Sequence, residues 1–532
     1  MKLSTKVAKL FVYLNLTAWA SFFVIFWLRA YEYKADGSVW AQSLGTWSDG
    51  AAHLTYISAM AYRLPTNLPI YMGKAFTYPF VSDLLSAMLV RLGVGVFSAY
   101  SLIGGLLSLI LLFSLFQFYK HLLGSKIWAV ISLDIFLLSG GVGIVKFLRD
   151  VNQKGVDLFW AIPQEYTLID EWKIRWINIV TAELIPQRAL LLALPLGLLV
   201  VWQLYWVLLG KYLSVRRGAL AGFIVGIMPL VHAHTYIVLA IVSLWLFLVS
   251  LNRPEKRKFW LSYGTVSLLV SLPIIFFHIL PASDTHFLRW YPGWLAGASQ
   301  SNWLWWWFVN VGLFWPLAWI GWLGMEKHLK LFSFGFWLVF IVANLWIFQP
   351  YDWDNAKLIT WSILALSPAV AISLQKFWRS GWVFKILSLL LFVSLTATGF
   401  LDVVRQLQPH TTVYMYGSQE LELVDWVKNN TDPQAIFLTG QSHVHPIPTL
   451  TGRQILMGYQ GWLWSYGIDF AQREQDVTQM YTAGDRELMK KYNVDYVVIG
   501  PDEINRFKNF GDFLSFDNAI YQSQDYRVYS VE

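Results

Sequence analysis

The stretch Met1–Lys34, MKLSTKVAKLFVYLNLTAWASFFVIFWLRAYEYK, decides the fold class. Three lysines precede an apolar run that continues from Leu10 to Leu28. About 20 such residues are enough for a helix to cross a bilayer, and the run is longer than the core of a signal peptide. We therefore expect an uncleaved spanning helix with its N-terminus inside, followed by a long first outer loop at about 30–78.

The composition supports a polytopic α-helical membrane protein. Of the 532 residues, 56% are hydrophobic and only 14% are charged, whereas a soluble domain of this length carries more surface charge. The net charge is +7, but the Lys and Arg residues gather in short runs between apolar segments, which is typical of topology signals. We therefore expect the lipid bilayer and no nucleic acid as a partner. Cysteine is absent, which excludes disulfides and thiolate catalysis.

Apolar periodicity predicts about 11 to 13 spans. Beyond the first, they are expected near 80–97, 99–118, 127–145, 187–209, 219–232, 234–251, 260–281, 303–324, 331–348, 357–374 and 383–401. Two full crossings between Pro79 and Phe118 would place the basic linker YKHLLGSK outside, against the positive-inside rule. Either one of those two segments is half-length or re-entrant, or the N-terminus is outside. We expect the first, with a break near Arg91, Gly93 and Gly95.

The composition changes near residue 402. Residues 1–401 are predicted to form the multi-span domain, and residues 402–532 a soluble extracytoplasmic α/β domain. The segments ELVDWVKNNTDPQAIFLTG and DRELMKKYNVDYVVIGPDE each predict a helix followed by a strand, and YRVYSVE predicts a final strand.

Asp49 and His53 stand four residues apart in WSDGAAHL, within the predicted first outer loop. On a helix they would share one face, where an acidic side chain can act as a general base or metal ligand. The alternative is local, because Ser48 or Asp49 stands where a helix N-cap belongs. The sequence leaves both interpretations open.

Three further groups of polar residues are expected at the outer ends of spans. Glu183, Gln187 and Arg188 surround Pro186, and Arg188 can either hold a lipid-linked phosphate or extend to headgroups. His232 and His234 are ligand contacts or satisfied core residues. In YDWDNAKL, Asp352 and Asp354 can share Mg²⁺ or Mn²⁺, and Lys357 can meet a phosphate; alternatively, Asp354 or Asn355 caps the next helix.

The C-terminal segment SHVHPIPTLTGRQILMGYQGWLWSYG combines aromatic, basic and glycine residues. Indole and phenol faces suit the C–H surfaces of sugar rings. The candidate substrate contacts here are His443, His445, Arg453, Tyr459, Trp462 and Trp464. The other interpretation is a domain core. No Walker A loop, dinucleotide fingerprint, nucleophile elbow or H-E-x-x-H motif occurs, which argues against an ATP-driven pump.

The order of these motifs resembles the GT-C superfamily of integral membrane glycosyltransferases, and within it the family 39, protein mannosyltransferase-like group. The motifs are WSDGAAHL with Asp49, FTYPFVSDLLSAML, IPQRALLL, VHAHTY, PYDWDNAKL and LTGRQILMGYQGWLWSYG. The resemblance implies that a sugar moves with inversion from a polyprenyl phosphate to an acceptor hydroxyl of a lipid, glycan or protein. It also implies that Asp49 is the catalytic base and that His53 orients Asp49 or contacts phosphate. Asp150, Glu165, Asp170, Glu171 and Glu183 are candidates for the second acidic residue of many relatives.

The sequence therefore predicts a glycosyltransferase of a bacterial plasma membrane whose active site faces the periplasm or exterior. The alternative function is a polytopic transporter or lipid-linked-sugar flippase with an extracellular accessory domain. Such proteins place their charges near mid-span. Here the singled-out residues lie at span ends, which favours transfer.

Overall fold

The computed structural model describes residues 5–62, 64, 67–282, 284, 287–508, 510 and 519–531. The chain divides into two compact units. Unit 1 comprises Met1–Phe26, Gly104–Ile274 and Leu288–Thr411, and unit 2 comprises Trp27–Ile103, Ile275–Phe287 and Thr412–Glu532. Each unit is thus assembled from segments far apart in the sequence. The predicted division at residue 401 concerns the position of a membrane and stays a prediction.

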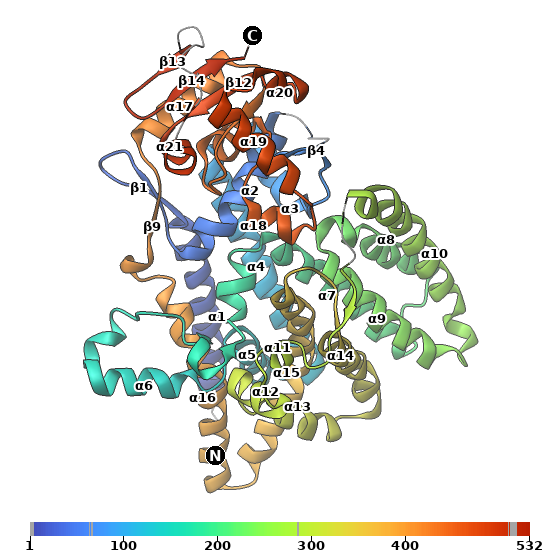
Figure 1. Ribbon diagram of the computed structural model, residues 1–532. Helices are drawn as coiled ribbons and strands as arrows, with labels where there is room; N and C mark the ends of the chain where they lie inside the picture. The colour runs from blue at the N-terminus through green and yellow to red at the C-terminus, as the bar shows by residue number, and fades with distance from the viewer. Residues whose placement is uncertain are drawn as a thin grey trace. The chain divides into compact units, whose positions relative to one another are not determined.

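Unit 1 is built mainly from helices (Figure 1), with two short antiparallel strand pairs, β5 (Leu168–Ile169) with β6 (Ile174–Arg175) and β7 (Arg289–Trp290) with β8 (Trp346–Ile347). The helices are α1 (Thr5–Leu28), α4 (Val96–Leu123), α5 (Lys126–Leu137), α6 (Gly143–Lys154), α7 (Arg188–Leu208), α8 (Val215–Val231), α9 (Ala233–Ser250), α10 (Arg257–Pro273), α11 (Leu295–Ala298), α12 (Trp303–Val311), α13 (Phe314–Leu323), α14 (Lys327–Leu345), α15 (Ala356–Arg379) and α16 (Trp382–Arg405), with α1 and α4 extending into unit 2. Among the described residues, 8 helical segments are long and apolar enough to cross a membrane. The chain is an integral membrane protein.

Two segments that were expected as single spans are broken. The segment 127–145 divides into α5 and α6, because the chain turns at Gly141, where a Cβ atom would collide with the Val309 carbonyl. The segment 303–324 divides into α12 and α13 at Gly312, whose φ of +61° lies in the left-handed region that favours glycine. The apolar pattern continues through both segments, but the close backbone approach at Gly141 and the left-handed residue Gly312 divide each of them into two helices.

Helices α8 and α10 lie side by side within unit 1 (Figure 1). Gly218, Gly222 and Gly226 recur every four residues along α8, and Cβ atoms on the first two would collide with the Phe259 and Tyr263 carbonyls of α10. Small residues at this spacing let helix backbones approach closely in a membrane. These glycines therefore allow the close packing of α8 against α10.

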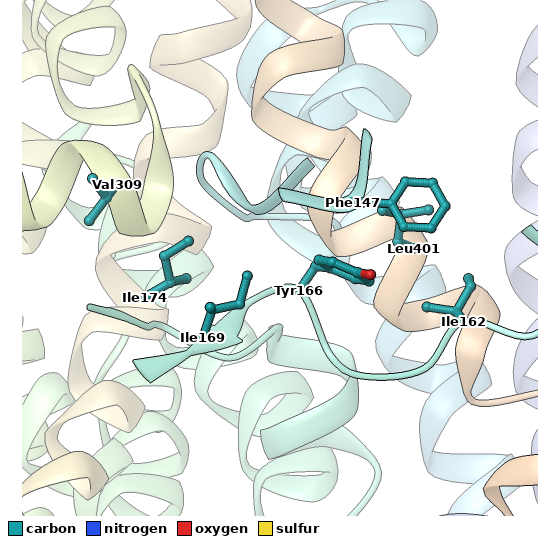
Figure 2. Close-up of a cluster of buried hydrophobic side chains, with 7 residues drawn as sticks. All are labelled: Phe147, Ile162, Tyr166, Ile169, Ile174, Val309 and Leu401. Carbon is teal, nitrogen blue, oxygen red and sulfur yellow. The ribbon is translucent and has the colours of Figure 1, made fainter. Parts of the chain in front are cut away.

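A buried apolar cluster anchors the segment between α6 and α7 in unit 1. Figure 2 shows its members, which are Phe147, Ile162, Tyr166, Ile169, Ile174, Val309 and Leu401. Side chains from α6, α12 and α16 meet the segment 162–174, which includes β5 and the first residue of β6, in this cluster. Asp402 reinforces it, because its carboxylate accepts hydrogen bonds from the backbone N–H groups of Tyr166 and Thr167 at 2.6 and 2.9 Å.

Unit 2 contains α2 (Leu44–Tyr62) and α3 (Val81–Arg91), together with small antiparallel sheets. Strands β1 (Tyr31–Tyr33), β2 (Val39–Ala41) and β9 (Val413–Tyr416) form one sheet, and β3 (Asn67–Leu68) pairs with β4 (Tyr71–Ala75). Helix α3 has only 11 residues, which corresponds to about 16 Å, and Gly93 follows it with a φ of +92°. The helix is therefore short and ends at the expected break, whereas its place in a membrane stays a prediction.

The C-terminal part of unit 2 is an α/β layer. Its sheet has the order β11–β10–β12–β14–β13, with β10 parallel to β11 and β12 and with β14 antiparallel to β12 and β13. The strands are β10 (Ile436–Leu438), β11 (Gln454–Ile455), β12 (Tyr496–Ile499), β13 (Tyr521–Gln522) and β14 (Arg527–Ser530), and the helices are α17 (Ser418–Asn430), α18 (Gln460–Ser465), α19 (Ala471–Ala483), α20 (Arg486–Lys491) and α21 (Pro501–Phe507). Both predicted helix–strand pairs and the predicted last strand are confirmed.

Candidate functional site

One face of α2 carries three polar side chains in unit 2. Asp49, His53 and Tyr56 stand at i, i+4 and i+7 and therefore share this face. Asp49 is half-buried, whereas His53 and Tyr56 are fully buried. The helix begins at Leu44, and the Ser43 hydroxyl accepts the Thr46 N–H at 3.3 Å. The interpretation of Ser48 or Asp49 as the N-cap is therefore wrong.

His53 forms a buried pair with Asp83, a residue of α3 that the sequence did not single out. His53 Nδ1 lies 2.8 Å from Asp83 Oδ2, and both side chains are shielded from solvent. An ionised carboxylate only accepts, so Nδ1 carries the proton and donates to Asp83. The Nε2 atom is buried and has no hydrogen-bond partner among the described residues. One polar atom of the site is thus left unsatisfied.

Tyrosines complete this face. The Tyr56 and Tyr466 hydroxyls lie 2.8 Å apart, and the Tyr78 ring packs 4.9 Å and 5.4 Å from their rings. Burial raises the pKa of both Tyr56 and Tyr466, and the nearby Asp49 charge acts in the same direction. Both phenols therefore stay protonated and act as hydrogen-bonding groups at neutral pH.

An aromatic cluster joins α2 to the C-terminal segment within unit 2. The Trp47 ring stands perpendicular to the His443 ring with centroids 4.1 Å apart, and Tyr459 and Trp462 lie 5.4 and 6.0 Å from His443. We call Trp47, His443, Tyr459 and Trp462 the aromatic wall. Burial lowers the pKa of His443, whose buried Nε2 has no partner among the described residues. Trp464 belongs to the same helix α18 but is half-exposed.

His445 and Arg453, which were expected to contact substrate, are structural. His445 Nε2 lies 3.0 Å from Glu503 Oε1 in the core. Arg453 is buried, and its guanidinium donates to the Thr451 carbonyl at 3.1 Å and the Thr431 carbonyl at 2.8 Å. Its cation also stacks 5.4 Å from the Tyr62 ring centre. Because these guanidinium N–H groups already donate to backbone carbonyls, the structure does not support phosphate binding by Arg453.

The remaining candidates gather in unit 1. Arg188 is fully buried at the first turn of α7, so the alternative that it extends to headgroups is wrong. Gln187 precedes it and is half-buried. His232 separates α8 from α9 and caps α9, since its Nδ1 accepts the Thr235 N–H at 3.2 Å.

His234 belongs to a hydrogen-bonded chain. Its Nε2 lies 2.9 Å from Gln349 Oε1, and the Gln349 amide donates to Asn355 Oδ1 at 2.9 Å. The Asn355 amide donates in turn to the Ala343 and Trp346 carbonyls. The side chain of Asn355 therefore does not cap α15, although the helix begins just after it.

Asp352 and Asp354, the predicted cation ligands, each face a basic side chain. Asp352 pairs with Arg289, and Asp354 Oδ1 lies 2.9 Å from Lys357 Nζ. Across the described part of the chain, no group of three or more His, Asp or Glu side chains is arranged to hold a metal ion.

Glu183 differs from the other candidates for a second acidic residue. Asp150 pairs with Lys146, Asp170 Oδ1 lies 2.9 Å from Arg175 Nε, and Glu165 accepts from Gln406. Glu183 is buried, and its Oε2 has no hydrogen-bond partner among the described residues. Burial raises the pKa of Glu183 to about 7.

This raised pKa predicts a stability that depends on pH. Native Glu183 keeps its proton up to a pH of about 7, whereas the unfolded chain loses it near 4.5, so its contribution to stability decreases as pH rises through that window. Glu183→Gln is expected to be more stable than wild type at pH 8, by roughly 3 kcal/mol at most, and equally stable at pH 4.5. Thermal unfolding in detergent measures this. Exposed Glu171→Gln is the control, and a gain that is the same at both pH values would contradict the prediction.

Comparison with solved structures defines the fold class. A scan against family models and a search of curated proteins found no match. The structure search gives GT-C glycosyltransferases, so the chain has the GT-C fold that its motifs indicated. The likeness is one of fold, because the sequence identities are below 25%.

Two of the similar structures are named here. Arabinofuranosyltransferase AftD from Mycobacteria, in a mutant form, matches with a TM-score of 0.57 and 14% identity over 97% of this chain and 41% of its own. This chain thus spans about two-fifths of that protein. ArnT from Cupriavidus metallidurans, bound to undecaprenyl phosphate, matches with a TM-score of 0.51 and 12% identity over 99% of this chain and 98% of its own.

Proposed function

We propose that this protein is a membrane glycosyltransferase that moves a sugar from a polyprenyl phosphate to an acceptor hydroxyl, on the outer face of a bacterial plasma membrane. The observation that carries the proposal is the α2 face, where half-buried Asp49 stands one turn before the buried His53–Asp83 pair. The GT-C fold and the undecaprenyl phosphate bound to ArnT support a lipid-linked donor.

Asp49 acts as the general base in this proposal. Its carboxylate takes the proton of the acceptor hydroxyl while that oxygen attacks the anomeric carbon. The phosphate leaves from the opposite side of the sugar, so the anomeric configuration is inverted. Because Asp49 is only half-buried, an incoming hydroxyl can reach it.

The phosphate of the carrier requires positive charge. Arg188 and Lys357 in unit 1 are the proposed phosphate contacts, with Arg188 able to bind two oxygens at once. Lys357 is already close to Asp354, so a phosphate would compete with that carboxylate. His232, His234, Glu183 and Gln187 are proposed to shape the donor site around them.

The aromatic wall is proposed to hold a sugar ring near Asp49, because Trp462 stands one turn before Tyr466, whose hydroxyl lies 2.8 Å from that of Tyr56 on the face of α2 that carries Asp49. Stacking on one aromatic face contributes about 1.5 kcal/mol, which corresponds to roughly tenfold in affinity. For Trp462→Ala, transfer should therefore become half-maximal at a concentration of acceptor extract roughly tenfold higher than for wild type. Trp426→Ala is the matched control, since Trp426 packs 5.0 Å from Tyr521 in the same unit. Equal effects of the two substitutions would contradict a binding role.

Transfer itself is tested with purified full-length protein in lipid. The donors are undecaprenyl phosphates that carry radiolabelled arabinofuranose, mannose or glucose, and a membrane extract supplies acceptors. We expect label to move from at least one donor into the extract. If no label moves from any donor while the carrier lipid crosses the bilayer, the transporter function replaces this proposal.

A further inference from the structure

The His53–Asp83 pair links α2 to α3, but a structural link does not account for His53 Nε2. The Nδ1 atom alone makes the 2.8 Å contact with Asp83. Nε2 is buried without a hydrogen-bond partner among the described residues, and leaving such an atom unsatisfied costs about 1–3 kcal/mol. The groups that face the ring from neighbouring elements are Asp83, Tyr78 with its ring centre at 5.9 Å, and Tyr100 at 6.5 Å.

Because the Asp49 carboxylate can only accept hydrogen bonds, it cannot bond to His53 Nε2 in the resting protein. An ionised carboxylate and the lone pair of Nε2 are both acceptors, so they cannot bond to each other. A carboxylic acid, however, carries one O–H donor. Asp49 precedes His53 by one helical turn on the same face, which is a spacing at which side chains meet. Protonation of Asp49 therefore creates the donor that Nε2 lacks.

We propose that His53, held by Asp83, is a positioning residue that stabilises Asp49 in the protonated form reached during transfer. This inference rests on the proposed function, in which Asp49 is the base. Because the Asp49–His53 bond exists only after proton transfer, it stabilises the transition state and not the resting enzyme. Asp83 fixes the ring orientation and stabilises positive charge on it.

The bonds and the proton balance in this step. The O–H bond of the acceptor breaks as its oxygen bonds to the anomeric carbon, and the bond from that carbon to the phosphate oxygen breaks with its electron pair leaving on the phosphate. The released proton binds an Asp49 oxygen and is shared with His53 Nε2. After product release it returns to water through half-exposed Asp49, because His53 itself is buried.

His53→Asn separates this role from a structural one. The asparagine amide can replace Nδ1 as donor to Asp83, but it has no atom in the place of Nε2. We expect kcat to fall at least tenfold, while the half-saturating donor concentration stays within twofold and the unfolding temperature stays close to that of wild type. Ser58→Ala is the control, since it removes another buried contact of α2, the 2.8 Å bond to the Thr449 carbonyl, and should leave kcat unchanged.

Asp83→Asn supplies a second test that does not depend on folding of the His53 variant. Its amide oxygen can still accept from Nδ1, but the negative charge is lost, so we expect a fall in kcat of about tenfold. Wild-type kcat in either folded variant would overturn the inference. If Asp49→Asn is inactive while both variants are fully active, only this inference fails. If wild type moves no label, the proposed function fails and the inference falls with it.

Discussion

Asp49→Asn is expected to lower the rate of sugar transfer about a thousandfold, which corresponds to about 4 kcal/mol of activation free energy. Asparagine has nearly the shape of aspartate but cannot accept the proton of the attacking hydroxyl. Because Asp49 lies inside α2 and does not cap it, the substitution should leave the helix and the unfolding temperature intact. The loss should therefore appear in kcat, measured as label moved per unit time at saturating donor.

The neighbouring Ser48→Ala variant controls for disturbance of α2. Ser48 is half-buried, and its hydroxyl donates a long hydrogen bond of 3.4 Å to the Gly45 carbonyl within the same helix. The transfer rate of Ser48→Ala should therefore match wild type. A folded Asp49→Asn protein that transfers sugar at the wild-type rate would remove Asp49 as the base. The proposed role of His53 would fall with it, since it acts through Asp49.

Glu503→Ala is expected to destabilise unit 2 by about 3–5 kcal/mol. Glu503 is fully buried, and its carboxylate accepts from His445 Nε2 at 3.0 Å, from the Gly440 N–H at 2.5 Å and from the Gly500 N–H at 2.8 Å. Burial alone would raise the pKa of Glu503, but His445 and these backbone donors hold it below its ordinary value. Alanine leaves all three donors unsatisfied, and the unfolding temperature measures the loss.

Glu487→Ala is the matched control, because the Glu487–Lys490 pair on α20 is exposed and such pairs contribute about 0–1 kcal/mol. A lowered folded pKa means that Glu503 stabilises the protein above the unfolded value of about 4.5, and that this contribution is lost as pH falls through the folded value. The difference between wild type and Glu503→Ala should therefore shrink in acid. A difference that stays constant with pH would contradict this assignment.

Hydrophobic periodicity and local turn signals predicted most of the long helices, but of the strands only β10, β12 and β14. The long spans α7, α9 and α15, and the pair α17–β10, follow directly from the pattern of apolar residues. The glycine break after Arg91 was predictable as well, because a left-handed residue at Gly93 leaves a local signal. The break at Gly141 was not, since it depends on the approach of a carbonyl from residue 309.

The candidate site was harder to predict because its contacts join distant residues. Asp83 lies 30 positions from His53, and although it belongs to the motif FTYPFVSDLLSAML, the sequence does not indicate that it contacts His53. Ser43, rather than Ser48 or Asp49, caps α2; all three are residue types that suit this position. Arg453 and His445 were expected in the site because they stand among glycines and aromatics in the sequence. In the structure, Arg453 donates to backbone carbonyls and His445 contacts Glu503.

The discontinuity of unit 2 has a consequence for synthesis on the ribosome. Helix α2 packs against η9 (Ile447–Thr451), and Ser58 bonds to Thr449 there. Residues 27–103 emerge first, and about 300 further residues must be translated before the segment from Thr412 onward can join them. At about 5–20 residues per second, the first segment waits roughly 15–60 s for its partner. The contacts of α2 with Thr449 and Tyr466 are therefore made last, so a nascent chain that stalls before Thr412 carries the proposed base without these two contacts.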